Sequence, residues 1–285
     1  MFALSLALSD RGWLWIAAAF YLIGFVQGTI SLLRGGRPAG SATYGLIAIG
    51  YAAQLVGLGI RGRAVAGCPL GNTFEIFQFT AWSAITLYLV VGLTFRNSLL
   101  GYFTCCLTAT LTVVSLAIPA WDATQRTHIF SANPWIELHA ALAVFSYGVF
   151  ALLALTSVMF LLRNYSLKSK QLGGWFSFLP SILDLDHISV RLLGAGVTIL
   201  TIALAIISIP WFRDPSTASP AKVLFAVAVW IVSLAVFGLR LRGVLLAKRF
   251  AWACLALFFG AIVSLVAVDR SRPPLPAKTA ALSSP

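Results

Sequence analysis

The stretch Ile136–Leu162, IELHAALAVFSYGVFALLALTSVMFLL, decides the fold class of this chain. After Glu137 it contains no Asp, Glu, Lys or Arg, and it exceeds the roughly 20 apolar residues that a helix needs to cross a bilayer. Backbone groups that face lipid must bond within their own segment, so an apolar run of this length forms a helix. The stretch therefore predicts a transmembrane helix.

The composition of the whole chain supports a membrane protein. Of its 285 residues, 60% are hydrophobic and 10% are charged, whereas soluble domains average about 45–50% apolar and about 25% charged residues. The mean hydropathy of +0.93 points the same way. These values exclude a disordered protein, a disulfide scaffold and a water-soluble enzyme of two domains.

The charge balance and the cysteines suggest no further function class. The net charge is +12, but the basic residues lie in short loops between apolar runs. There they orient the chain and contact lipid headgroups, so we expect no nucleic-acid binding. Three of the four cysteines lie in apolar runs, and no CxxC or His/Cys metal spacing occurs. Walker, HExxH and GxSxG motifs are also missing from the sequence, so we expect no enzyme.

Seven more apolar runs are long enough to span a membrane. Together the runs predict an all-α, polytopic integral membrane helix bundle with eight transmembrane helices. Residues 1–268 would form a single membrane domain, and residues 269–285, rich in Pro, Ser and Ala, a disordered C-terminal tail. No basic region precedes the first run, so we expect no cleaved signal peptide. The predicted spans are Trp13–Leu33, Ser41–Ile60, Thr73–Leu93, Leu99–Ile118, Ile136–Leu162, His187–Pro210, Lys222–Leu239 and Lys248–Val268.

The orientation in the membrane follows from the basic residues of the short loops. With the N-terminus outside, ten Lys and Arg residues fall in inner loops and nine in outer segments. The two densest basic groups, Arg163 to Lys170 and Arg240 to Arg249, both fall inside in this orientation. We therefore expect both termini outside.

The loop before the Thr73–Leu93 span carries two polar residues with alternative roles. Asn72 suits an N-cap, and Glu75, three residues on, suits a capping box, which is a structural role. The helix that follows has a stripe of polar and aromatic residues, and such stripes in lipid face a bundle interior or a cavity. Glu75 and Trp82 are therefore candidates either for structural contacts or for a pocket wall. The stripe comprises Glu75, Gln78, Phe79, Trp82 and Thr86.

His139, in the first turn of the Ile136–Leu162 span, has two possible roles as well. It is either an interfacial histidine bonded to a carbonyl, or a ligand of a transition metal such as haem iron. Trp121, Trp135 and Trp211 lie at the same outer boundary. These tryptophans are either an interfacial aromatic belt or a platform on which a flat apolar ligand stacks.

Three polar positions inside or beside the spans have structural interpretations. Arg191 lies one turn after Asp184 and Asp186, so we expect it to pair with one of them or to extend to the inner headgroups. Gln27 and Gln54 are candidates for hydrogen bonds between helices.

Three stretches resemble one known family when they are taken together. Residues 68–75, CPLGNTFE, followed by FTAW at 79–82, resemble the "PLSNLYES…FLSW" stretch of the CcsA-type cytochrome c assembly proteins. Residues 135–139, WIELH, followed by Ser146 and Tyr147, resemble the outer "W…H…SY" segment of the same family. Residues 179–186, LPSILDLD, with the Arg-Leu and Leu-Thr pairs that follow, resemble its "LPSLE-LD…YRL…LT" stretch. The order and the spacing agree over roughly residues 40 to 268.

This resemblance implies a function in cytochrome c biogenesis at a bacterial inner (cytoplasmic) membrane. Members of the family handle haem on the outer side and present it to apocytochrome c. Of the family's functional residues, only the outer histidine carries over, onto His139, where the resemblance implies an axial haem ligand. Around it we expect a pocket wall formed by Trp121, Trp135, Trp211, Trp82 and Glu75. Haem, bound transiently, would then pass to an assembly partner protein or to apocytochrome c, in contact with the lipid bilayer.

The sequence departs from the family pattern in two places. Only Trp211 and Asp214-Pro215 echo the family's tryptophan-rich loop, and no histidine follows His187. These losses resemble the HemX-like branch of the family. They leave open two alternatives to haem delivery, namely a non-enzymatic regulator or scaffold of tetrapyrrole biosynthesis and a small-molecule transporter.

Overall fold

The computed structural model describes residues 9–36, 40–92, 100–123, 133–170, 179–213 and 220–270. Within these ranges it contains eight α-helices and one 3₁₀ helix, as the sequence predicts for an all-α protein. The tail that follows residue 270 lies outside the described residues, as does His128. The helices are α2 (Asp10–Leu33), α3 (Gly40–Val65), α4 (Thr73–Gly92), α5 (Leu100–Ala117), η1 (Pro119–Asp122), α6 (Pro134–Lys168), α7 (Ile182–Arg213), α8 (Pro220–Leu241) and α9 (Ala247–Arg270).

Each of the eight α-helices coincides with one predicted span. Six of the described helices, all except α4 and α9, are long and apolar enough to cross a membrane, so the chain is an integral membrane protein. The α9 helix continues the apolar run at 250–268, but its last turns lie outside the side chains that the structure describes. In α4 the polar stripe that begins at Glu75 lowers the apolar content.

Local sequence signals set where several helices begin and end. The Asn133 side chain accepts a hydrogen bond from Trp135 N at 3.1 Å, and Pro134 occupies the first turn of α6. Gly35 and Gly243, both with φ of +72°, follow the ends of α2 and α8. Glycine tolerates this left-handed conformation without steric cost, so the chain can turn sharply there. The α6 helix runs six residues beyond the predicted end at Leu162, because polar residues continue the helix past the apolar run.

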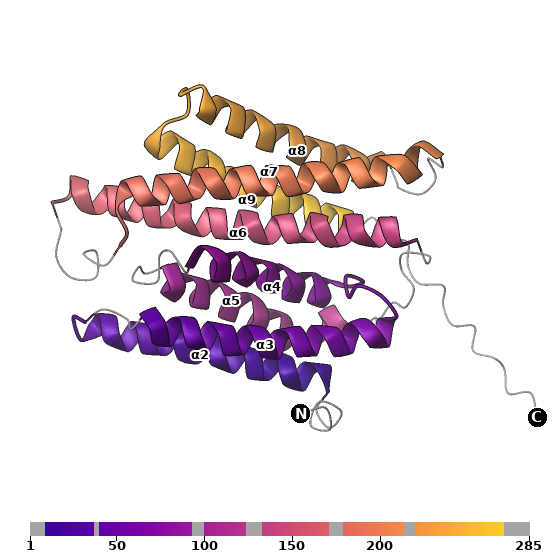
Figure 1. The fold of residues 1–285 in the computed structure, drawn as a ribbon, viewed down its shortest axis with the longest axis horizontal. Helices are drawn as coiled ribbons and strands as arrows, with labels where there is room; N and C mark the ends of the chain where they lie inside the picture. Colours follow the sequence, from indigo (N-terminus) through magenta and orange to yellow (C-terminus); the bar gives the residue numbers. More distant parts are fainter. Residues whose placement is uncertain are drawn as a thin grey trace, which may run out of the picture.

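The helices form two groups of four that lie side by side (Figure 1). Helices α2 to α5 make one half and α6 to α9 the other, and α4 packs against α6 across the seam between the halves. The approach there is close: a Cβ atom on Gly148 of α6 would lie 1.7 Å from Ser83 Oγ of α4. Small residues at such crossings let helix backbones pack tightly in a membrane.

Burial distinguishes the central helices from the peripheral ones. In the most apolar window of α6, 72% of the residues are buried inside the protein, against 6% for α8. The α6 helix therefore lies at the centre of the bundle, whereas α8 presents most of its surface to lipid.

A chain of buried amides and hydroxyls ties the first half together. Tyr21 Oη donates to Gln54 Oε1 at 3.0 Å, and Gln54 Nε2 donates to Gln78 Oε1 at 2.9 Å. Gln78 Nε2 in turn donates to Ser115 Oγ at 2.8 Å. These bonds link α2, α3, α4 and α5 in sequence. They confirm the prediction that Gln54 bonds between helices, whereas Gln27 is only half-buried on α2.

One ion pair at the end of the bundle where α7 begins differs from the prediction. Asp186 pairs with Arg240 of α8 and not with Arg191, which is exposed on α7. Asp184 accepts a hydrogen bond from Ser181 Oγ at 2.7 Å. Of the two alternatives for Arg191, pairing with one of these carboxylates is wrong, because Arg240 reaches Asp186 from the neighbouring helix. The exposed position of Arg191 leaves extension to the headgroups as the remaining prediction.

Candidate functional site

The family-like motif at residues 68–75 forms the turn between α3 and α4. Asn72 Oδ1 accepts a hydrogen bond from Glu75 N at 2.8 Å, and Glu75 Oε2 accepts one from Gly71 N at 2.6 Å. The amide side chain caps the helix while the carboxylate reaches back to the turn. These two bonds confirm the capping interpretation of Asn72 and Glu75.

Glu75 also belongs to a buried charge cluster, which we define as Asp10, Arg11, Arg61, Glu75 and Asp122. Arg61 Nε donates to Glu75 Oε1 at 2.7 Å, and Arg61 Nη1 donates to Asp10 Oδ2 at 2.8 Å. Asp122 pairs with Arg61 Nη2 as well, and it accepts from Arg11 Nη1 at 2.7 Å. The charge cluster thus joins the starts of α2 and α4, the end of α3, and η1.

The central pair of this cluster is almost completely withdrawn from solvent, whereas Asp10 and Arg11 at its edge are 22% and 32% exposed. The side chains of Arg61 and Glu75 are 1% and 0% exposed. An unpaired charge at such depth would cost several kcal/mol, so each of these two side chains depends on the other once both are buried. The ring of Phe74 lies 4.9 Å from the Arg61 guanidinium carbon and 5.2 Å from that of Arg11, which adds a cation–π contact to each.

Sequence reasoning missed this cluster because it treated Arg11 and Arg61 as loop charges. Arg61 directly follows the predicted end of a span at Ile60, whereas α3 continues to Val65. One further helical turn carries Arg61 into the bundle beside Glu75. The sequence did offer one signal, because the carboxylates Asp10, Glu75 and Asp122 lie at comparable depth in the neighbouring segments.

A second contact ties the start of α6 to the α3–α4 turn. The Glu137 carboxylate accepts a hydrogen bond from the backbone N–H of Cys68. Burial, together with the nearby charges of Glu137 and Glu75, raises the pKa of the Cys68 thiol to about 12. This thiol therefore stays protonated at neutral pH and is a poor nucleophile.

His139 makes the carbonyl hydrogen bond expected of its structural role, and the same bond is compatible with a metal-ligating imidazole. Its Nδ1 lies 2.7 Å from the carbonyl oxygen of Ala203 on α7. A carbonyl can only accept, so Nδ1 carries the hydrogen and Nε2 keeps its lone pair. Histidines that ligate metals typically donate their other N–H to a carbonyl or carboxylate in this way. The imidazole fits a single axial ligand of haem. In the residues that the structure describes, no group of three His, Cys, Asp or Glu side chains forms a site for a bare metal ion.

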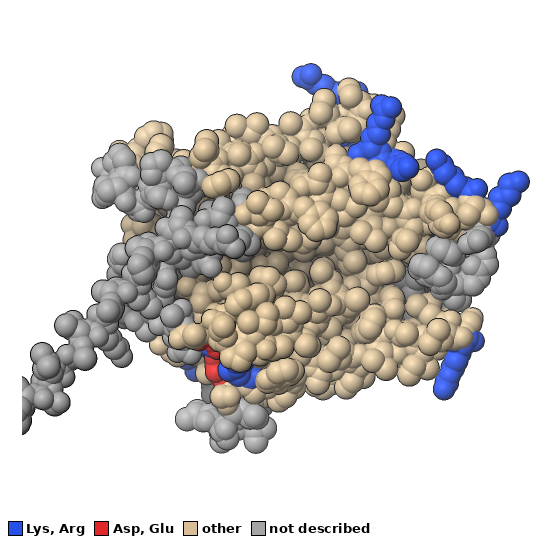
Figure 2. Space-filling view, turned by 180° about the vertical axis from the view of Figure 1, so that it is seen from behind, with Lys and Arg blue, Asp and Glu red and all other residues tan. Residues whose placement is uncertain are grey.

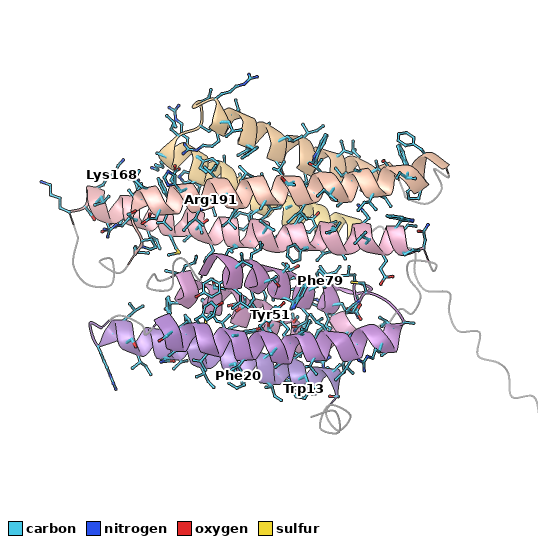
Figure 3. All side chains as sticks on the ribbon, viewed as in Figure 1. Trp13, Phe20, Tyr51, Phe79, Lys168 and Arg191 are labelled. Carbon is cyan, nitrogen blue, oxygen red and sulfur yellow. The ribbon has the colours of Figure 1, made fainter. Side chains whose placement is uncertain are left out.

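The four predicted wall tryptophans occupy different places. Trp82 stacks on Tyr51 of α3, with ring centroids 6.0 Å apart, and meets Phe145 of α6 edge-on at 6.0 Å. Tyr51 and Phe79, which also contacts Trp82, both lie on the α3–α4 side of the seam (Figure 3). Trp121 packs on Phe77 beside the charge cluster, with centroids 4.8 Å apart.

The other two tryptophans belong to the second half of the bundle. Trp135 is 59% exposed in the first turn of α6, and Trp211 lies beside Phe212 at the end of α7. Trp135 and His139 are four residues apart on α6, so they share one face of that helix.

The structure separates these residues into two sets. Glu137 and Gly148 are the α6 residues that meet the α3–α4 turn and α4. At about 100° per residue they lie about 160° and 180° around α6 from His139. Hence His139 and Trp135 face α7 and its surroundings, while Trp82, Trp121 and Glu75 lie on the α4 side. Glu75 lines no open surface, because it is 0% exposed and both of its carboxylate oxygens are engaged.

Comparisons with known proteins agree with these motifs. The chain is 28% identical over 200 residues to protein HemX of Bacillus subtilis. This match covers 69% of this chain and 68% of that protein. It is 27% identical over 177 residues to protein HemX of Brevibacillus brevis, covering 61% of this chain and 65% of that one. It is also 27% identical over 129 residues to the cytochrome c biogenesis protein CcsA of Cyanidium caldarium, covering 41% and 40%. The model of the cytochrome C assembly protein family matches residues 70–268, from the α3–α4 turn to the end of α9, and the chain therefore belongs to this family.

Proposed function

We propose that this protein handles haem in cytochrome c biogenesis, with Nε2 of His139 as an axial ligand. One observation carries the proposal: the bond from Nδ1 to Ala203 O leaves Nε2 as the nitrogen with a free lone pair. His139 belongs to the segment that the family model matches. When haem is bound, its iron supplies the coordination chemistry and the protein supplies binding and orientation.

The residues around His139 have distinct roles in this proposal. Ala203 O holds the imidazole plane by accepting from Nδ1, so that Nε2 keeps one orientation. Trp135, one turn earlier on the same face, and Trp211 at the end of α7 offer aromatic surface to the ring. Trp82, Trp121 and Glu75 act indirectly, because they hold α4, η1 and the α3–α4 turn in place beside α6.

We further propose that all eight helices span the bacterial cytoplasmic membrane, with both termini outside. Two features support this orientation. At the end with the charge cluster, Arg11 and Arg61 are neutralised by carboxylates inside the protein. At the opposite end, Lys and Arg side chains protrude into the surroundings (Figure 2). Because Lys and Arg in short loops favour the cytoplasmic side, the exposed cations at this end support its placement inside the cell.

The haem would pass from this protein to an assembly partner or to apocytochrome c. The protein provides one imidazole and no second histidine in the helices that follow α7. With His139 as the one residue that would hold the haem iron, the partner would supply the remaining ligand, which suits transient binding. The role is that of a carrier and not of a catalyst.

An absorption spectrum of the purified protein tests the proposal. The wild-type protein, isolated in detergent with haem added, should show a Soret band shifted from that of free haem, and His139→Ala should lose the shift. His187→Ala is the matched control, since His187 is exposed at the inner end of α7. An identical, shifted spectrum for wild type and His139→Ala would exclude His139 as the haem ligand. No shift in either protein would favour a haem-free scaffold or regulator.

A further inference from the structure

The turn between α8 and α9 combines exposed cations with exposed aliphatic side chains. We define this basic turn as residues 241–249. Leu241, Val244 and Leu246 are 67%, 60% and 56% exposed. The cations of the basic turn are Arg242, Lys248 and Arg249, all exposed.

The conformation of the basic turn is held by specific contacts. Gly243 N donates to Arg240 O at 3.0 Å and Val244 N donates to Leu239 O at 3.0 Å, which is the Schellman pattern that ends α8. Arg240 Nη1 donates to Leu245 O at 3.1 Å, and its guanidinium carbon lies 5.0 Å from the centroid of the Phe250 ring. The ion pair between Arg240 and Asp186 fixes the turn to α7. The turn is therefore preformed.

The cations of the basic turn lack protein counter-ions. Within the described part of the chain, the structure gives no ion pair to Arg242, Lys248 or Arg249. The nearest carboxylate, Asp186, is already engaged by Arg240. Three positive charges on a short, fixed turn therefore attract anions from outside the protein.

The aliphatic side chains decide which anions fit. Apolar surface costs about 25 cal/mol per Å² when it faces water, so a turn that exposes three aliphatic side chains favours an apolar environment. Both adjoining helices continue with lipid-facing residues, including Trp252, 57% exposed, on the second turn of α9. Tryptophan at this depth is typical of the headgroup layer. The turn thus has phosphate-binding charges at the level where aliphatic side chains enter the acyl region.

From this combination we infer that the basic turn is a binding site for the phosphate headgroups of anionic phospholipids. Arg242, Lys248 and Arg249 contact the phosphates, and Leu241, Val244 and Leu246 insert beside the first acyl carbons. The site lies at the end of the molecule opposite to the charge cluster, so it is independent of haem binding by His139.

Native mass spectrometry of the detergent-solubilised full chain tests this site. The protein is titrated with dioleoyl-phosphatidylglycerol and, separately, with dioleoyl-phosphatidylcholine. We expect tighter binding of the phosphatidylglycerol, with a preference that falls at high salt because exposed charges are screened. Each cation removed should weaken that binding by about fivefold, and the triple variant R242Q/K248Q/R249Q by on the order of 100-fold.

Arg63→Gln against Arg249→Gln is the matched comparison, because each removes one exposed cation at opposite ends of the protein. Arg249→Gln should weaken phosphatidylglycerol binding, and Arg63→Gln should not. All variants should melt like the wild type, since their side chains are exposed. Equal affinity for the two lipids, or an unchanged affinity in the triple variant, overturns the proposal. An acidic protein crosslinked to the turn together with equal lipid affinities would overturn it in favour of a protein partner.

Discussion

Replacing the buried Arg61 should destabilise the protein more than replacing an exposed cation such as Arg63. In Arg61→Met, the carboxylates of Glu75, Asp10 and Asp122 lose their shared guanidinium. Glu75 is 0% exposed and cannot recover its hydration, so the change leaves an uncompensated buried charge. Removing one partner of a buried pair costs about 3–5 kcal/mol. For a chain of this size, that loss lowers the melting midpoint by on the order of 10 °C.

The assay uses the protein's own cysteines. Cys105 and Cys254 are 0% exposed, so a thiol-reactive fluorophore reports their release as the protein unfolds in detergent. Arg63→Met is the control, because Arg63 is exposed two residues further along α3. A double variant, R61M/E75M, should recover part of the loss, since it removes both members of the closest pair.

Two outcomes would contradict a stabilising role of the charge cluster. If Arg61→Met melts at the same temperature as Arg63→Met, the buried pairs contribute nothing to stability. If R61M/E75M melts no higher than Arg61→Met, the loss does not come from the unpaired Glu75 carboxylate.

Two further predictions concern the seam and the α3–α4 turn. Gly148→Ala should destabilise the protein by about 1–3 kcal/mol, because the new Cβ overlaps Ser83 at the α4–α6 crossing. Gly238→Ala is the control, since a Cβ there meets nothing within 4 Å, and this variant should melt at or above the wild-type temperature. Cys68 should react slowly with a membrane-impermeant maleimide at pH 8, and faster as the pH approaches its pKa of about 12. Glu137→Gln removes a negative charge that raises this pKa, so labelling of Cys68 at pH 8 should become faster; an unchanged rate would contradict that electrostatic assignment.

The sequence by itself determined the class of fold and most helix positions. Runs such as Ile136–Leu162 can satisfy their backbone groups in lipid only as helices, so length and hydropathy were sufficient. The capping role of Asn72 and the bonding role of Gln54 were also readable, because each depends on a local motif or on the cost of an amide in lipid.

Tertiary structure alone decided which polar groups meet. The ion pairs of Arg61 join residues up to 61 positions apart, and the partner of Asp186 proved to be Arg240 and not Arg191, which lies closer in sequence. The rotation of α6 placed Glu137 toward the α3–α4 turn and His139 toward Ala203, and so divided the residues expected in one pocket. Hydropathy is almost the same all round a helix in a membrane, so the sequence carries little information about its rotation. Packing at close crossings such as Gly148 against Ser83 sets that rotation.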